Sequence, residues 1–247
     1  MECGADVSAQ AEDGRTPMHL ASERGCVDVA RMLVECSADV SAQAKDRRTL
    51  LHWVSSRGHV DVAQMLVERS ANVSAQDKGG RTPLYWASLY SHVDVAQMLM
   101  ECGTNVSAQD KDRRTLLHWA LSRGHVDVAQ MLMERSANVS AQAEDRRTPL
   151  HWALSRGHMD VAQMLMECSA DVSAQAEDRR TPLHWALSRG HVDVAQMLME
   201  HGANMSAQAK DGRTPLHLAL SRGHVDVAQM LMECSTNGQP IQFDSHS

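Results

Sequence analysis

Short clusters of apolar residues recur along the chain, and polar segments separate each cluster from the next. Within residues 148–157, Leu150, Ala153 and Leu154 recur at positions i, i+3 and i+4, which is the spacing of one helix face. Residues 159–167 form a second cluster, rich in Val, Ala, Met and Leu. The pattern predicts two short helices followed by a polar connector.

The residues at the ends of the first cluster set the limits of its helix. Thr148 is a good N-cap, and Pro149 at the first helical position loses no hydrogen bond. Gly157 follows the cluster, where glycine accepts the left-handed conformation that ends a helix. Helices this short cannot bury enough surface alone, so we expect them to be stable only when stacked on further copies.

The same pattern recurs every 33 residues over nearly the whole chain. The Arg-Thr pair that opens each copy begins at Arg15, Arg48, Arg81, Arg114, Arg147, Arg180 and Arg213. The predicted boundaries are 1–12 for a partial repeat, then 13–45, 46–78, 79–111, 112–144, 145–177, 178–210 and 211–237 for repeats one to seven, and 238–247 for a C-terminal tail.

The repeating unit resembles the ankyrin repeat. The resemblance rests on the period, on Thr-Pro-Leu-His-x-Ala at residues 148–153, on Gly-His between the helices and on Ala-Asp-Val or Ala-Asn-Val in the connector. It covers residues 1 to about 237. It implies an all-α solenoid of stacked helix-turn-helix units with projecting hairpin loops, or fingers. It also implies a concave groove, lined by the fingers and the first helices, that binds a partner protein or peptide.

The function implied by the resemblance is that of a protein–protein interaction scaffold, of the kind that longer proteins carry as a recognition segment. An alternative stays open, because no polar cap is obvious at either end of the array. Uniform, uncapped repeats also suit a structural spacer that self-associates through its ends. In the tail, Ile241 and Phe243 are expected to fold over the last repeat as a cap.

Composition and charge argue against several other functions. The formal net charge is −7, which disfavours a general affinity for nucleic acid. No apolar run is long enough to cross a membrane, and the N-terminus does not resemble a signal peptide. Five of the six cysteines hold one repeated position, where copies lie about 10 Å apart or more. A disulfide needs Cα atoms within roughly 7 Å, so we expect no pairing and an intracellular, cytoplasmic location, with the nucleus left open.

Two repeated positions depart from the ankyrin pattern. In four finger turns Arg replaces the usual Gly, and if the turn needs a positive φ each Arg costs about 1 kcal/mol. These residues are Arg47, Arg113, Arg146 and Arg179. Leu50 and Leu116 replace Pro at the helix start, and we expect those helices to survive.

Trp holds one position in repeats two to six, and Leu holds it in the first and last repeats. An aromatic ladder that stacks on a ligand is one interpretation. We favour a wedge between the helix layers, because the terminal Leu residues keep the position apolar.

Repeat three breaks the symmetry of the array. It has Tyr85 in place of His, Leu89 and Tyr90 in place of Ser-Arg, and Ser91 in place of Gly. By resemblance, positions 89 and 90 face the groove, and Tyr is common in binding hot spots. Leu89 and Tyr90 are therefore candidate partner-binding residues.

Two rows of arginine are further candidates for an acidic or phosphorylated partner. Those predicted to contact a partner are Arg57, Arg123, Arg156 and Arg189 in one row, and Arg48, Arg81 and Arg114 in the other. The alternative is mutual neutralisation, because an Asp lies two residues before most members of the second row.

Histidine recurs at two positions of the unit, which favours a structural role, since a catalytic group is expected once and with dedicated partners. The ankyrin resemblance implies that the first of these histidine series forms hydrogen bonds within and between repeats, and we predict no enzymatic activity and no metal or other cofactor.

Overall fold

A computed structural model describes residues 4–237, apart from the side chains of residue 227 and residues 233–237. The chain divides into two compact units, one ending at Ala137 and the other beginning at Asn138. The helices of the first unit are α1 (Pro17–Arg24), α2 (Val27–Glu35), α3 (Leu50–Arg57), α4 (Val60–Glu68), α5 (Pro83–Leu89), α6 (Val93–Glu101), α7 (Leu116–Arg123) and α8 (Val126–Glu134). Those of the second are α9 (Pro149–Arg156), α10 (Met159–Glu167), α11 (Pro182–Arg189), α12 (Val192–Glu200), α13 (Pro215–Ser221) and α14 (Val225–Asn237).

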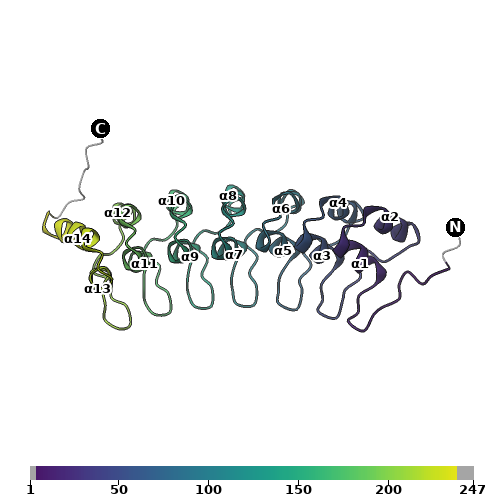
Figure 1. The fold of residues 1–247 in the computed structure, drawn as a ribbon, viewed down its shortest axis with the longest axis horizontal. Helices are drawn as coiled ribbons and strands as arrows, with labels where there is room; N and C mark the ends of the chain where they lie inside the picture. Colours follow the sequence, from purple (N-terminus) through teal and green to yellow (C-terminus); the bar gives the residue numbers. More distant parts are fainter. Residues whose placement is uncertain (1–3, 238–247) are drawn as a thin grey trace. The chain divides into compact units, whose positions relative to one another are not determined.

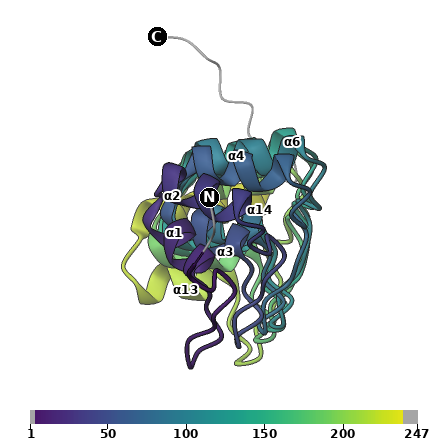
Figure 2. The same ribbon diagram turned by 90° about the vertical axis from the view of Figure 1, so that its right-hand side faces the viewer.

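Each unit consists of two layers of helices (Figure 1). In the first unit α1, α3, α5 and α7 pack side by side in one layer, and α2, α4, α6 and α8 form the other. The view along the first unit shows this second layer above the first, with the connecting loops extending away from both (Figure 2). The second unit has the same arrangement, with α9, α11 and α13 on the side of the loops. The predicted all-α stack of helix pairs is thereby confirmed.

The core of each repeat is the predicted apolar face. Leu150, Ala153 and Leu154 on α9 are fully buried, as are Ala162 and Leu165 on α10. The helices α1 to α13 have only 7–9 residues each. This burial therefore depends on the helices of neighbouring repeats. The helices without Pro begin at Leu50 and Leu116, so their expected survival is also confirmed.

The connectors project as fingers, as predicted (Figure 1). One backbone hydrogen bond joins each finger to the next within a unit: the Lys45 N–H donates to the Asp13 carbonyl, and the Lys78 N–H to the Asp46 carbonyl. At the finger turn Arg47, Arg113, Arg146 and Arg179 have φ of 64, 58, 59 and 60°, in the left-handed region. The predicted strain at these arginines is therefore present.

Replacing a finger arginine with glycine should stabilise the protein. We expect Arg113→Gly to raise the free energy of unfolding by about 1 kcal/mol, because glycine accepts positive φ without steric cost. Gly80→Ala is the matched opposite, since Gly80 has φ of 79° and an added Cβ would meet only an ordinary contact, 3.6 Å from the Lys111 nitrogen. Urea unfolding of both variants checks this, and a shift of both midpoints in the same direction would contradict it.

Cysteine pairing differs from the prediction at one residue. Cys26, Cys102 and Cys168 are free and exposed. Cys36 is disulfide-bonded, so the prediction that no cysteine pairs is wrong there. The prediction assumed that each cysteine lies in a complete repeat stacked on its neighbours. Helix packing sets a minimum distance between equivalent cysteines only under that condition. The predicted cap at Ile241 and Phe243 lies outside the described residues.

In the part of the chain that the structure describes, no helix is long and apolar enough to cross a membrane.

Candidate partner-binding site

The first series of histidines caps the first helix of every repeat except repeat three, which has Tyr85 at this position. At His52 the Thr49 backbone N–H donates to Nδ1 at 3.0 Å, and the Thr49 hydroxyl accepts from the backbone of His52. His Nε2 then donates to a carbonyl of the following repeat, at 3.0 Å from His52 to Arg81 and at 3.1 Å from His151 to Arg180. These bonds require the neutral ring with its proton on Nε2. The predicted hydrogen bonds within and between repeats are confirmed.

Burial keeps these capping rings neutral. It lowers the pKa of His19, His52 and His184 below the ordinary value, and that of His151 to about 4. In each case desolvation of the charged ring is the largest cause.

In the first unit the second series of histidines links repeats two, three and four to the repeat before each of them. His59 Nε2 donates to the Glu23 carbonyl at 3.0 Å, and His125 Nε2 to the Leu89 carbonyl at 3.0 Å. Both carbonyls lie at or near the C-terminal end of a first helix, where a side-chain donor is favourable. No group of three or more His, Cys, Asp or Glu side chains among the described residues is arranged to hold a metal ion.

The tryptophans alternate with arginines of the second row. The Arg48 guanidinium lies 5.2 Å from the centre of the Trp53 ring and 3.8 Å from that of Trp86. In the second unit Arg147 lies in the same way 4.9 Å from Trp185. Trp86 is 6% exposed, which agrees with the predicted wedge, whereas the other four tryptophans are half-buried against these cations. This row of arginines is thus largely part of the scaffold.

Most arginines of the second row are also paired with acidic residues. Asp46 lies 3.3 Å from Arg48, Asp145 lies 3.6 Å from Arg147, and in the same way Asp178 lies 3.5 Å from Arg180. The alternative of mutual neutralisation therefore describes these residues.

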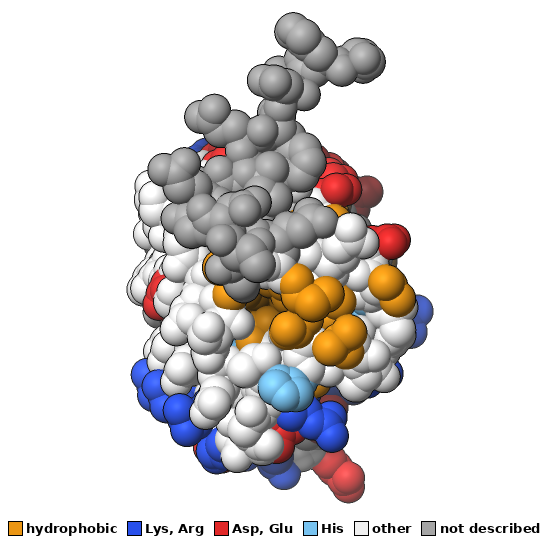
Figure 3. Space-filling view, turned by 90° about the vertical axis from the view of Figure 1, so that its left-hand side faces the viewer, with side chains coloured by type: hydrophobic (Ala, Val, Ile, Leu, Met, Phe, Trp, Pro, Cys, Tyr) orange, Lys and Arg blue, Asp and Glu red, His pale blue; other side chains and the backbone are white. Residues whose placement is uncertain are grey.

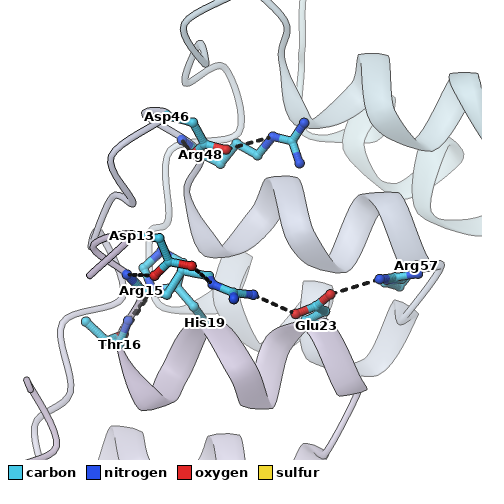
Figure 4. Close-up of polar contacts among 8 residues, drawn as sticks. All are labelled: Asp13, Arg15, Thr16, His19, Glu23, Asp46, Arg48 and Arg57. Carbon is cyan, nitrogen blue, oxygen red and sulfur yellow. Dashed lines mark hydrogen bonds and ion pairs between the residues drawn. The ribbon is translucent and has the colours of Figure 1, made fainter. Parts of the chain in front are cut away.

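In repeat one Glu23 also neutralises arginines (Figure 4). It stands at a position where most other repeats have Ser. Its carboxylate lies 3.0 Å from Arg15 and 2.8 Å from Arg57, so it joins one member of each arginine row. Arg57 is therefore engaged by the protein itself.

Repeat three differs from this scheme at a position that precedes its first helix. Gly79 replaces the aspartate found at the start of the other repeats, and Arg81 forms no ion pair with the described residues. The Arg81 guanidinium lies instead 5.4 Å from the Tyr85 ring and 5.3 Å from the Trp86 ring. Asp77 accepts a hydrogen bond from the Arg81 backbone N–H at 3.0 Å, but its carboxylate lies within ion-pair distance of Arg48, so the Arg81 guanidinium is without an ion pair among the described residues.

The two rings beside this cation belong to a cluster of four aromatic side chains. Tyr85 is in edge-to-face contact with Trp86 and with Trp119, each at 5.6 Å between ring centres. Trp86 stacks on Tyr90 at 6.2 Å. Burial raises the pKa of Tyr85 to about 12, so its hydroxyl keeps its proton. No other part of the described array gathers aromatic rings in this way.

These side chains line a pocket of about 440 Å³ between repeats three and four. Leu89 and Tyr90 contribute from the end of α5, and Arg123 from the end of α7. Asp110 also lines the pocket, but its carboxylate accepts hydrogen bonds from the Trp119 indole at 2.9 Å and from the backbone N–H groups of residues 112 and 114. A volume of this size falls within the range of ligand pockets, about 300–1,000 Å³.

The structure brings four of the nine predicted site residues together in this pocket. Tyr90 is 51% exposed and Leu89 is 8% exposed, so Tyr90 presents the surface while Leu89 forms part of the interior. Arg81 and Arg123 are the two cations that join them. Arg48 and Arg114 lie over Trp rings, at 3.8 and 4.9 Å, and do not line the pocket. Arg156 and Arg189 are exposed in the second unit.

Sequence reasoning did not assign the other seven lining residues to the site. Tyr85, Trp119 and Gly79 all line the pocket, and the first of them was noted only as a departure from the repeat. The signal at Gly79 is visible in the sequence, since it is the one repeat start that lacks an aspartate.

Comparisons with known proteins identify the class of this fold. A family model for three copies of ankyrin repeats matches residues 37–110, 102–176 and 169–242, and a model for a single ankyrin repeat matches residues 13–45. The chain therefore belongs to the ankyrin repeat family.

One similar solved structure is the crystal structure of the human ASB11 ankyrin repeat domain. It is 28% identical in sequence, with a TM-score of 0.75, and the match covers 89% of this chain and 97% of that chain. No curated protein sequence matches the chain. Ankyrin repeats are generally protein–protein interaction modules, and the family is typically non-enzymatic.

Proposed function

We propose that this protein is a recognition module that binds a partner protein through the α5–α7 surface around Tyr90. The observation that supports this most directly is the break in symmetry at repeat three. There an exposed Tyr stands in place of the Arg of the other repeats and beside a pocket. Exposed Tyr next to a desolvated pocket is typical of interface hot spots.

The rest of the array supplies rigidity to this surface. The histidines are used in caps and bridges, and the tryptophans and their arginines in packing. The polar groups of the repeated residues therefore take part in contacts that hold the repeats together. This supports a binding function over a catalytic one.

Site-specific photo-crosslinking tests the location of the partner site. A photoreactive phenylalanine derivative is placed at residue 90, and in a matched control at residue 156, the equivalent exposed position of repeat five. In lysate we expect residue 90 to crosslink a discrete protein that residue 156 does not. The same protein should be lost from pull-downs with Tyr90→Arg, which restores the residue of the other repeats. Equal crosslinking from both positions would place the partner elsewhere.

Self-association is a second candidate function, because two surfaces of the array are apolar. Leu220, Val225 and Met232 on α13 and α14 are 57, 68 and 50% exposed, and apolar side chains gather on this end face (Figure 3). On α1 and α2, Leu20, Val29 and Met32 are 47, 44 and 52% exposed. Val29 is the equivalent of residues that are fully buried in repeats two to four, such as Val62 and Val95.

The two surfaces correspond to the two sides of one repeat–repeat contact, so a head-to-tail contact between copies would be heterologous and open-ended. Light scattering over a range of concentrations tests this candidate. A growing series of oligomers that Val29→Glu abolishes would support it, and a monomer at all concentrations would oppose it.

A further inference from the structure

The pocket between repeats three and four has an excess of unpaired positive charge. Arg81 and Arg123 form no ion pair with the described residues, whereas the carboxylate of Asp110 is occupied by three N–H donors. Of the remaining charged lining residues, Lys111 and Asp112 are exposed and of opposite sign. A ligand that enters this pocket therefore meets three cations and two carboxylates, and the carboxylate of Asp110 already accepts three hydrogen bonds.

The same pocket offers a hydrogen-bond donor and an apolar wall. The Tyr85 hydroxyl keeps its proton and forms no hydrogen bond with the described residues. Arg81 lies against the ring of Tyr85, so a guanidinium and a phenol belong to the same side of the pocket. Leu89, Trp86 and Tyr90 form the apolar wall, of which Tyr90 is the exposed edge.

Repeat two shows how the same three positions are occupied where no pocket residue has been replaced. In repeat two the equivalent residues are Asp46, Arg48 and His52. There Asp46 neutralises Arg48, and His52 is used for capping and bridging. Repeat three lacks both groups, since Gly79 replaces the aspartate and Tyr85 replaces the histidine. In repeat three, an anion from a ligand can therefore bind Arg81 in the way that Asp46 binds Arg48 in repeat two.

We propose that the pocket binds an acidic peptide segment of the partner, with a Glu or Asp carboxylate held by Arg81, Arg123 and the Tyr85 hydroxyl and an adjacent large apolar side chain packed against Trp86 and Tyr90. This inference rests on the proposed protein-binding function and names the chemistry of its partner. Guanidinium groups recognise carboxylates with strong, charge-assisted hydrogen bonds, and the aromatic wall adds apolar contact. The pocket volume of about 440 Å³ is large enough for more than a single side chain.

Gly79→Asp is the sharpest variant for testing this proposal. A Cβ at residue 79 would approach the Arg81 Nε at 2.7 Å, which is the far end of a flexible side chain, and Gly79 does not adopt a positive φ. The new carboxylate would then pair with Arg81, as aspartate does in repeats one, two and five. The variant keeps every other residue of the pocket and adds one carboxylate, which pairs with Arg81.

The experiment selects dodecapeptides from a random phage-displayed library on the intact chain and measures their affinity by fluorescence anisotropy. We expect selected peptides with Glu or Asp beside Leu, Ile, Phe, Tyr or Trp, and an affinity that falls with added salt. Gly79→Asp, Arg81→Gln and Tyr90→Arg should each weaken binding about tenfold or more. Arg147→Gln, at the paired equivalent of Arg81 in repeat five, should leave it unchanged.

The possible outcomes separate this inference from the proposed function. Selected peptides that are neutral or basic, or that bind Gly79→Asp as well as the intact chain, would overturn the acidic-peptide inference while leaving protein binding in place. Failure to select any peptide, together with no specific crosslink from residue 90, would count against both. Circular dichroism and the melting temperature of each variant establish that lost binding does not come from lost folding.

Discussion

Acidification from pH 7.5 to pH 4.5 is expected to lower the unfolding midpoint of this protein in urea, before most of its carboxylates are protonated. The capping histidines have an ordinary pKa of about 6.5 when unfolded, and burial lowers the pKa of His151 to about 4 in the fold. Between these values the unfolded chain binds more protons than the folded one, so stability is present above pH 6.5 and is lost as the pH falls.

The expected size of this loss is large because several repeats contribute. The shift at His151 alone corresponds to about 3 kcal/mol. His19, His52 and His184 shift in the same direction and for the same cause. Repeat three has Tyr85 at this position and should not take part in the effect.

His151→Gln provides the matched control. Glutamine at this helical position preserves a reciprocal cap with Thr148 and does not titrate. We expect the variant to be less stable than the intact chain at pH 7.5, since it loses the bridge to the Arg180 carbonyl, but to lose less stability on acidification. Unfolding curves that coincide for the intact chain at pH 7.5 and 4.5 would show that the rings titrate alike in both states.

Trp86→Ala is expected to be among the most destabilising single substitutions, with a loss of about 3–5 kcal/mol. The side chain is 6% exposed, and its removal leaves a cavity bounded by Arg48, Tyr85 and Tyr90. Urea unfolding followed by circular dichroism measures the change in free energy of unfolding.

Trp185→Ala is the comparison for this substitution. Trp185 is half-buried, with guanidinium groups at 4.9 and 5.9 Å, so its removal leaves a more open site that solvent fills. We expect a clearly smaller loss than at Trp86. Equal losses in the two variants would mean that the arginine contacts, and not burial in repeat three, determine the stabilisation by tryptophan.

The helices could be predicted closely from the sequence because their limits are local. Thr148, Pro149 and Gly157 predict the bounds of α9, and the second apolar cluster predicts those of α10. Capping groups and glycine act within a few residues, so one copy of the repeat is enough to place them. The finger strain followed in the same way, from a side chain at a turn that requires positive φ.

The candidate site was only partly predictable because it depends on contacts between repeats. The ion pair between Glu23 and Arg57 joins residues 34 positions apart, so no local sequence pattern indicates it. Leu89 was assigned to the surface by analogy with the other repeats, whereas packing places it in the interior beside the exposed Tyr90. The pocket is lined by Gly79, where the other repeats have aspartate, and this difference becomes visible only when the copies are compared.

Gly79 has a consequence for how sites multiply in an array of this kind. The pocket is made by one 33-residue unit and its successor, and most of the successor's contribution, including Trp119 and Arg123, recurs in other repeats. Duplication of repeats three and four together would therefore create a second pocket two periods further along, whereas a copy of repeat three alone would place Tyr90, not Arg123, at the successor's position. Two such pockets on one chain would make the protein bivalent, and a partner with two suitably spaced acidic segments would gain affinity from a high effective concentration without any new contact.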